Sequence, residues 1–97
     1  MKSVMIKEQA GEFCENKDVS RAIRIKTILP ALLDKKKVTL DFAGVDMVTQ
    51  SFIHSLIAEP IREFPEEFFE LVSFKNCNKD VRTIVEIVAQ YMQDFAV

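Results

Sequence analysis

Apolar residues recur along this chain with two periods, and segments of the two kinds alternate. Val38-Thr39-Leu40-Asp41-Phe42 alternates strictly between apolar and polar positions, which is typical of a strand with one buried face. Shorter apolar runs predict a first strand over residues 3–8 and a third over residues 71–74. Residues 9–18 are mostly polar around Gly11 and favour either a loop or a short return strand.

Three further segments carry apolar residues at steps of three and four, which is the spacing of one helix face. They predict helices over residues 20–35, from residue 51 to residue 64, and after residue 78. The apolar positions are Ala22, Ile25, Ile28, Leu29, Leu32 and Leu33 in the first helix, Phe52, Ile53, Leu56, Ile57, Ile61 and Phe64 in the second, and Val81, Ile84, Val85, Val88, Tyr91, Met92 and Phe95 in the third.

Short polar side chains mark the expected starts of these helices, because they accept hydrogen bonds from free backbone N–H groups. Ser20 is the first candidate to cap the first helix, and Asp18 is the competing one. Thr49 or Ser51 can cap the second helix. The last helix has Asn78 as its expected cap.

Prolines predict irregularities in two of the helices. Pro30 lacks a backbone N–H and crowds the preceding turn, so we expect a kink or break near Ile28-Leu29. Pro60 predicts a bend in the second helix for the same reason. Pro65, followed by two acidic residues, suits the first turn of a short helical connection.

The predicted elements run strand, helix, strand, helix, strand, helix. This alternation indicates an α/β domain with a parallel or mixed sheet and helices packed on it. Three strands make a small sheet, so we expect a fourth short strand within residues 9–15. A length of 97 residues predicts one domain over residues 1–97.

Composition and charge narrow the class of protein. Thirteen basic and fifteen acidic side chains give a net charge of −2, whereas nucleic-acid binders usually carry a basic surplus. No stretch approaches the roughly 20 apolar residues of a membrane span, and the N-terminus turns polar too soon for a secretory signal. We therefore expect a cytoplasmic protein without a nucleic-acid or membrane partner, in which Cys14 and Cys77 are reduced.

Motifs for catalysis and cofactor binding are missing from the chain. His54 lies three residues after Ser51, but no glycine-rich elbow precedes that serine, so a helix-surface histidine is favoured over a catalytic one. One histidine and two scattered cysteines give no metal-ligand spacing, and there is no phosphate-binding glycine loop. We expect a protein that is not an enzyme and has no metal or cofactor.

One segment shows a pattern beyond packing: the strand over residues 38–42, the turn at Gly44, and a helix start rich in hydroxyl groups. A helix N-terminus presents free N–H groups and the positive end of the dipole. Thr49 or Ser51 therefore suits either a simple cap or a phosphorylated hydroxyl, and the simple cap is favoured by the spacing alone.

Phenylalanine is the other notable feature, with eight in the chain. Five of them fall between residues 52 and 74, namely Phe52, Phe64, Phe68, Phe69 and Phe74. Either all of them pack in the core, or some form an exposed apolar patch that a partner or a second copy covers.

Around the strand over residues 38–42, the Gly44 turn and the following helix start, the sequence resembles the STAS superfamily, the fold of bacterial anti-anti-sigma factors. More closely, it resembles the family of STAS-like domains of unknown function. The resemblance runs from about Ser20 to Tyr91. It is carried by Ser20-Arg21, Leu40-Asp41-Phe42 with Gly44-Val45, Ser51-Phe52, and Ser73-Phe74-Lys75-Asn76-Cys77, in this order and spacing.

The resemblance implies a STAS-like α/β fold, with a small mixed sheet of four to five strands and helices mainly on one face. It also implies a non-catalytic regulatory role. Anti-anti-sigma STAS proteins bind a kinase that is also an anti-sigma factor, and phosphorylation at the start of the second helix breaks that complex. The STAS-like family is often encoded beside histidine-kinase-type ATPase domains, which suggests a similar partner.

This chain departs from the anti-anti-sigma pattern at the helix start. With Val45 laid on the family valine, Thr49 replaces the expected Asp and Gln50 replaces the phosphorylated Ser. Phe52 takes the place of a Gly, and Thr49 and Ser51 flank the lost acceptor. Thr49 and Ser51 are accordingly the candidate phosphorylation sites.

The resulting hypothesis is a bacterial protein-interaction module whose surface includes the Gly44–Ser51 loop and the adjacent Phe64–Phe69 region. Its partner is a kinase- or ATPase-type regulator, with homodimerisation left open. The predicted partner-binding residues are Asp41, Gly44, Asp46, Thr49, Gln50, Ser51 and Phe52. The alternative is a small-ligand or nucleotide-sensing STAS-like domain.

Overall fold

The central sheet of the protein has three parallel strands. The structure is a computed structural model that describes residues 2–96, with side chains described as far as Asp94. The strands β1 (Lys2–Met5), β3 (Val38–Asp41) and β5 (Val72–Lys75) lie in the order β1-β3-β5. The register aligns Val4, Leu40 and Phe74 across the sheet.

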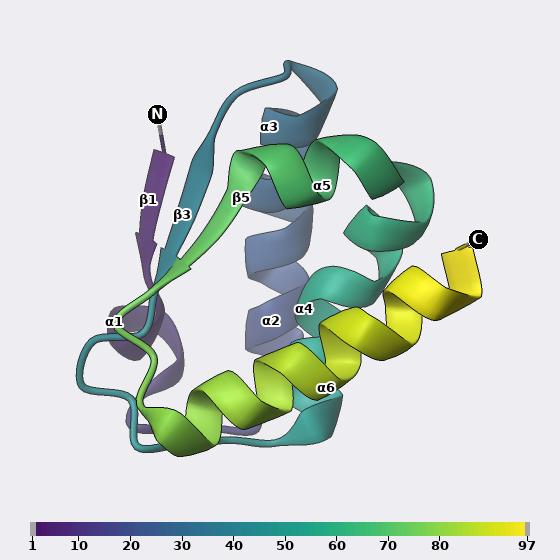
Figure 1. The fold of residues 1–97 in the computed structure, drawn as a ribbon. Helices are drawn as coiled ribbons and strands as arrows, with labels where there is room; N and C mark the ends of the chain where they lie inside the picture. Colours follow the sequence, from purple (N-terminus) through teal and green to yellow (C-terminus); the bar gives the residue numbers. More distant parts are fainter. Residues whose placement is uncertain (1, 97) are drawn as a thin grey trace.

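The sheet corrects the predicted one of four to five mixed strands. The expected strand within residues 9–15 exists as β2 (Phe13–Cys14), but it pairs in parallel with β4 (Met47–Val48) in a separate two-stranded sheet. The helix α1 (Ile6–Ala10) turns the chain away from the end of β1, so β2 cannot continue the main sheet (Figure 1). Residues 6–8, predicted as part of the first strand, are therefore helical.

The first long helix starts earlier than predicted. It consists of α2 (Lys17–Ile23), the π-helical segment η1 (Arg24–Ile28) and α3 (Leu29–Leu33). Asn16 is its cap, since its side chain accepts from the Asp18 N–H at 2.9 Å. Ser20, predicted as the cap, is instead buried within the helix and donates to the Lys17 carbonyl at 3.0 Å.

Pro30 produces a π turn rather than a break. The Leu29 N–H donates to the carbonyl of Arg24, five residues back, so the chain widens by one residue just before the proline. This widening accommodates the missing Pro30 N–H and the bulk of its ring. The irregularity predicted near Ile28-Leu29 is therefore a π-helical segment, and α3 follows it without a break.

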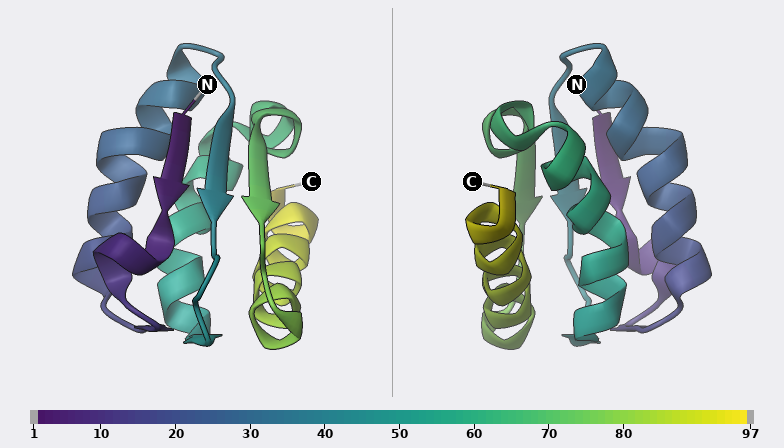
Figure 2. Two further views of the ribbon diagram at one scale, coloured as in Figure 1. Left: turned by 90° about the vertical axis from the view of Figure 1, so that its left-hand side faces the viewer. Right: turned by 90° about the vertical axis from the view of Figure 1, so that its right-hand side faces the viewer.

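The remaining helices are α4 (Gln50–Glu63), α5 (Pro65–Leu71) and α6 (Lys79–Ala96). Pro60 lies inside α4, which continues to Glu63. The connection that begins at Pro65 is a complete short helix. Figure 2 shows the helices α2 to α6 on the same side of the sheet, as the prediction of helices on one face requires.

The core lies between the sheet and these helices. Val38, Leu40 and Phe42 of the central strand and its continuation are each 0% exposed, as are Phe52 and Ile53 of α4. Among the described residues no helix covers the other face of the sheet (Figure 2). The strand residues on that face are mostly polar. They are Ser3, Met5, Thr39, Asp41, Ser73 and Lys75.

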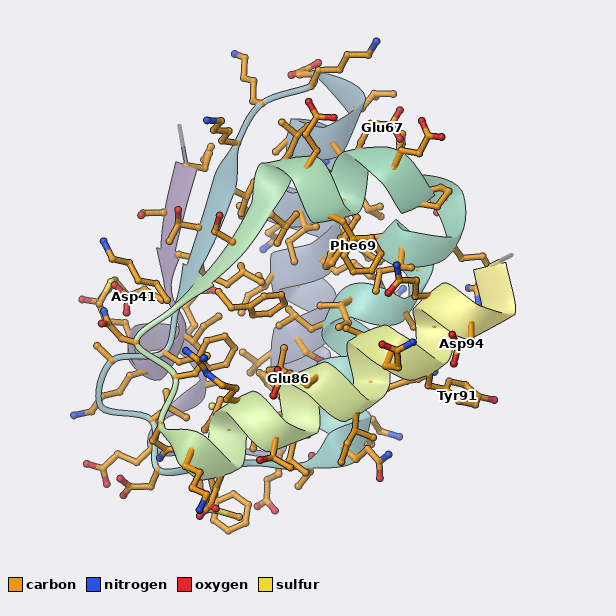
Figure 3. All side chains as sticks on the ribbon, viewed as in Figure 1. Asp41, Glu67, Phe69, Glu86, Tyr91 and Asp94 are labelled. Carbon is orange, nitrogen blue, oxygen red and sulfur yellow. The ribbon has the colours of Figure 1, made fainter. Side chains whose placement is uncertain are left out.

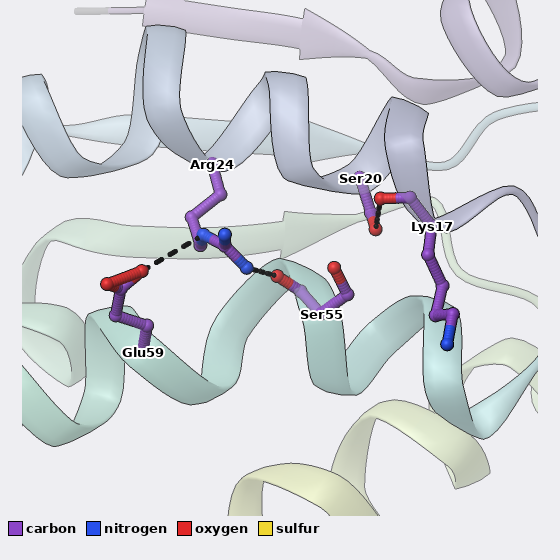
Figure 4. Close-up of polar contacts among 5 residues, drawn as sticks. All are labelled: Lys17, Ser20, Arg24, Ser55 and Glu59. Carbon is purple, nitrogen blue, oxygen red and sulfur yellow. Dashed lines mark hydrogen bonds and ion pairs between the residues drawn. The ribbon is translucent and has the colours of Figure 1, made fainter.

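An arginine joins η1 to α4 on the side away from the sheet (Figure 4). Arg24 Nη1 donates to the Ser55 carbonyl at 2.6 Å, and Arg24 Nε lies 3.2 Å from Glu59 Oε1. The second contact is an ion pair without the alignment of a hydrogen bond. Because the Arg24 side chain is only 17% exposed, these contacts fix the helix pair that carries α4 over the sheet.

Candidate protein-interaction site

The predicted site forms one end of the molecule, where β3 runs into α4. We call residues 42–52, together with β2, the β3–α4 tip; it lies at the lower end of the view in Figure 1. Gly44 makes the turn with a φ of +77°, and a Cβ there would stand 2.9 Å from Lys7 Cδ. The positive φ favours glycine here, and a side chain at this position would also have to displace the Lys7 side chain.

Asp41 holds the first part of the tip. Its Oδ1 accepts from the Ala43 N–H at 2.9 Å and from Asn76 Nδ2 at 3.0 Å. These hydrogen bonds, with the positive charge of Lys75, hold the pKa of the Asp41 carboxyl below its ordinary range. Asp41, predicted as a partner-binding residue, therefore orients the loop through these hydrogen bonds.

Asn78 joins the tip to the last helix. Its Oδ1 accepts from the Val81 N–H at 2.8 Å, which makes it the cap of α6, as predicted. Its Nδ2 donates to the carbonyls of Val45 at 3.2 Å and Asp46 at 3.0 Å. One side chain thus caps the N-terminal end of α6 and fixes the backbone of the tip.

The β2–β4 pair adds an apolar feature that the sequence reasoning missed. The Glu12 carbonyl accepts from the Asp46 N–H at 2.8 Å, and the register places Phe13 beside Met47. Both side chains are exposed, Phe13 at 57% and Met47 at 40%. The available signal was Phe13 itself, a large apolar residue in an otherwise polar segment.

Thr49 is the cap of α4, so the competing choice of Ser51 is wrong. Thr49 Oγ1 accepts from the Phe52 N–H at 3.0 Å. Gln50 and Ser51, in the first turn, are exposed, and the Ser51 hydroxyl lies 3.5 Å from that of Thr49. Of Thr49 and Ser51, Ser51 is the more exposed, and its hydroxyl does not cap the helix.

The predicted partner-binding residues differ from one another in their exposure to solvent. Gly44, Asp46, Gln50 and Ser51 are exposed, and Asp41 and Thr49 are partly buried. Phe52 is 0% exposed and belongs to the core, because its helical position points at the sheet. A partner cannot contact Phe52 at the surface.

The Phe64–Phe69 region does not adjoin the tip, contrary to the prediction. It follows the C-terminal end of α4, and the 14 residues of that helix span about 20 Å. Figure 1 shows α5 at the opposite end of the molecule from the tip. Of the phenylalanines there, Phe68 is buried and Phe69 is 43% exposed, so neither all-core packing nor a broad exposed patch describes them fully.

A cavity of about 420 Å³ opens beside the tip between α4 and α6. It is lined by Gln50, Ser51, His54, Val88 and Tyr91. Among the described residues no hydrogen bond joins His54 to Ser51, so the geometry shows no activated serine. The cavity extends the exposed part of the tip onto α6.

The thiols and acids supply no further chemistry in the described part of the chain. Cys14 and Cys77 are free, and burial raises the pKa of both thiols, which disfavours the reactive thiolate. No group of three or more His, Cys, Asp or Glu side chains within residues 2–94 is placed to hold a metal ion.

The fold and the site define a small α/β domain with helices on one face of a parallel sheet and a structured turn between β3 and α4. The family model of the STAS-like domain of unknown function matches residues 22–82, and the chain belongs to this family. Comparison with curated proteins and with solved structures gives no match. Among the described residues, no helix is both long and apolar enough to span a membrane.

Replacing Thr49 by Ala should lower the free energy of unfolding by about 1 kcal/mol, because the Phe52 N–H loses its cap. Thr49→Ser keeps the hydroxyl and should lose clearly less. The exposed Gln50→Ala variant is the control and should stay within about 0.5 kcal/mol of the wild type. Urea unfolding curves measure all three, and equal losses for Thr49→Ala and Thr49→Ser would contradict the capping role.

Asp41 should make stability depend on pH in the acid range. Its folded pKa is lowered, so its contribution is present above the unfolded pKa of about 3.9 and is lost as pH falls through the folded pKa. The stability difference between wild type and Asp41→Asn should therefore be largest near neutral pH and shrink below pH of about 4. Urea unfolding at a series of pH values tests this.

A matched variant isolates the cause of the Asp41 shift. Asn76 has a φ of +59°, so Asn76→Gly keeps the backbone conformation while removing the amide that donates to Asp41. The pKa of the Asp41 carboxyl, followed by NMR, should rise in Asn76→Gly. An unchanged titration would show that the Asn76 hydrogen bond is not the main cause.

Proposed function

We propose that this chain is a non-catalytic, cytoplasmic regulatory module of bacterial origin that binds another protein through the β3–α4 tip. The observation that carries the proposal is the exposed Phe13–Met47 pair beside the exposed first turn of α4. In the anti-anti-sigma relatives that this fold resembles, the partner is a kinase that is also an anti-sigma factor. A kinase- or ATPase-type regulator is the partner we propose here.

The physical character of the tip suits a protein interface. Interfaces bury an apolar centre and surround it with polar groups that remain near solvent. Phe13 and Met47 supply the apolar centre, and Asp46, Gln50 and Ser51 supply exposed polar groups around it. The hydrogen bonds of Asp41, Thr49 and Asn78 fix this backbone beforehand, which lowers the entropy lost on binding.

Ser51 is the regulatory acceptor that this geometry favours. Its hydroxyl is exposed in the first turn of α4, where the helix dipole stabilises a phosphate. The Thr49 hydroxyl already accepts the capping hydrogen bond from the Phe52 N–H, which makes Thr49 the weaker candidate. A phosphate on Ser51 would place about −1.5 to −2 charges on the partner-binding surface and oppose an acidic partner.

Photo-crosslinking in cells of the source organism tests the binding surface. A photoreactive phenylalanine analogue at Phe13 should capture one protein partner, whereas the same analogue at Leu33, which is 71% exposed on another face, should not. Ser51→Glu should reduce the Phe13 crosslink at least several-fold, and Ser51→Ala should keep it. Mass spectrometry of the captured band identifies the partner.

Three results would count against the proposal. Equal capture from Phe13 and Leu33 would remove the preference for the tip. Capture of this same chain alone at Phe13 would replace the regulator by a homodimer. A catalysed reaction that His54→Ala abolishes would contradict the non-catalytic role.

The cavity between α4 and α6 supports a second candidate function, the binding of a small ligand such as a nucleotide. Its volume of about 420 Å³ lies within the range of small-molecule sites, and Gln50, Ser51 and His54 supply polar groups. If this function holds, ATP or GTP should raise the melting temperature of the wild type, because a ligand of the folded state stabilises it. His54→Trp, at an exposed position that lines the cavity, should fill it and cancel the rise, and no rise with any nucleotide tested would exclude nucleotide sensing.

A further inference from the structure

The strand β5 lies at one side of the sheet, and its outer edge is separate from the tip. The strand order β1-β3-β5 leaves one side of β5 without a neighbouring strand among the described residues. The Lys75 carbonyl accepts from the Phe42 N–H at 2.8 Å, so Lys75 directs its backbone groups toward the β3 side. In a parallel ladder alternate residues face opposite neighbours, so Phe74 directs its N–H and C=O at the free edge.

Few backbone groups of β5 are available for hydrogen bonding at this edge. The Val72 N–H is already used, since it donates to the Phe68 carbonyl at the end of α5. Phe74 is therefore the residue of β5 that offers both a donor and an acceptor to a new strand. Unpaired strand edges of this kind are templates for pairing with another chain.

A groove lies beside this edge, between β5 and α6. It has a volume of about 300 Å³ and is lined by Phe74, Cys77, Arg82, Val85 and Glu86. Figure 2 shows α6 behind β5 and reaching past its free edge. Figure 3 shows Phe69 between α5 and α6, and Glu86 on α6. A strand placed at the edge would have α6 beneath it and would point every second side chain into the groove.

The lining of the groove indicates what it would accept. Phe74 stacks against Phe42, with ring centroids 6.1 Å apart, and is only partly covered, so the floor is aromatic and apolar. Arg82 and Glu86 lie one turn apart on α6, yet no ion pair joins them and Arg82 forms no other ion pair within residues 2–94.

We propose that the β5 edge is a docking site for an extended segment of a partner protein, which adds to the sheet as a fourth strand. Its backbone pairs with the N–H and C=O of Phe74. One aromatic or branched aliphatic side chain enters the groove, and an acidic side chain two residues away meets Arg82. This is strand addition, in which main-chain hydrogen bonds give affinity and alternate side chains give specificity.

The geometry favours an extended segment over a second copy of the chain. Two β5 strands would have to pair at about 4.8 Å, whereas packed helices need about 8–10 Å between their axes. Since α5 and α6 both project past the edge in Figure 2, the helices of two copies would meet before the strands could pair. A single extended chain brings no helix to that side.

An array of octapeptides tests the proposal on the full-length protein. Each peptide carries a variable apolar residue and, two residues away on the same face of the strand, Glu in one set and Lys in the other. The Glu set should bind, and fluorescence anisotropy of its best member should give an affinity about tenfold lower for Arg82→Glu. Lys79→Glu makes the same charge change on α6 outside the groove lining and should change the affinity less than threefold.

N-methylation of the peptide tests the strand pairing itself. Methylating the amides of one parity, those that face β5, should abolish binding, and methylating the other parity should leave it. Binding that survives both sets, or no binding by any peptide of either array, would overturn the proposal. A preference for the Lys array in the wild type would overturn the acidic chemistry of the occupant.

Two measurements separate this inference from its rivals. Sedimentation of the wild type should show a monomer, and a dimer with exchange-protected amides in β5 would assign the edge to a second copy. Ser51→Glu, which tests the tip, should leave peptide binding unchanged. Failure at the edge with an intact crosslink at Phe13, or the reverse, therefore distinguishes the two surfaces.

Discussion

Burial of β3 between two parallel neighbours is the constraint on which the rest of this structure depends. Val38, Leu40 and Phe42 are each 0% exposed, and burying such a side chain fully contributes about 1.5–3 kcal/mol. Parallel strands must be joined by crossovers, and their C-terminal ends all lie at the same end of the sheet. The segments that leave β1, β3 and β5 therefore converge, which is why β2 and the Gly44 turn form the tip and the start of α6 is hydrogen-bonded to it.

The sequence predicted an element correctly where the spacing of its apolar residues fits only a strand or only a helix. The strand at residues 38–42 was predicted because its alternation admits no helical reading, and α6 because its apolar stripe and Asn78 agree. The start of the first long helix was misplaced since its first two residues, Lys17 and Asp18, are polar, and the true cap, Asn16, precedes the apolar stripe. Residues 6–8 were misassigned because Ile6 ends the apolar run of the strand but is followed by good helix formers.

The site was predictable as far as its chemistry is local. Gly44 and Thr49 act through their own backbone or a residue three positions away, and both were found from the sequence. Asn78 was recognised as a cap, but its bonds to the Val45 and Asp46 carbonyls join residues more than thirty positions apart and exist only in the folded chain. Phe52 was assigned both to the apolar stripe and to the partner surface. These assignments conflict, and burial in the core prevails because the apolar face of α4 must pack on the sheet.

The helix α6 connects the surfaces that this small domain leaves open. Its first turn is tied to the tip through Asn78, its middle lines the groove beside β5 through Val85, and Val88 and Tyr91 form one wall of the cavity above α4. A helix that packs mainly on α4 cannot shift at one of these places without shifting at the others, since close-packed interiors move as units. The two carbonyls held by Asn78 therefore fix more than a loop: they set where a long helix lies, and with it the shape of every concave surface around it.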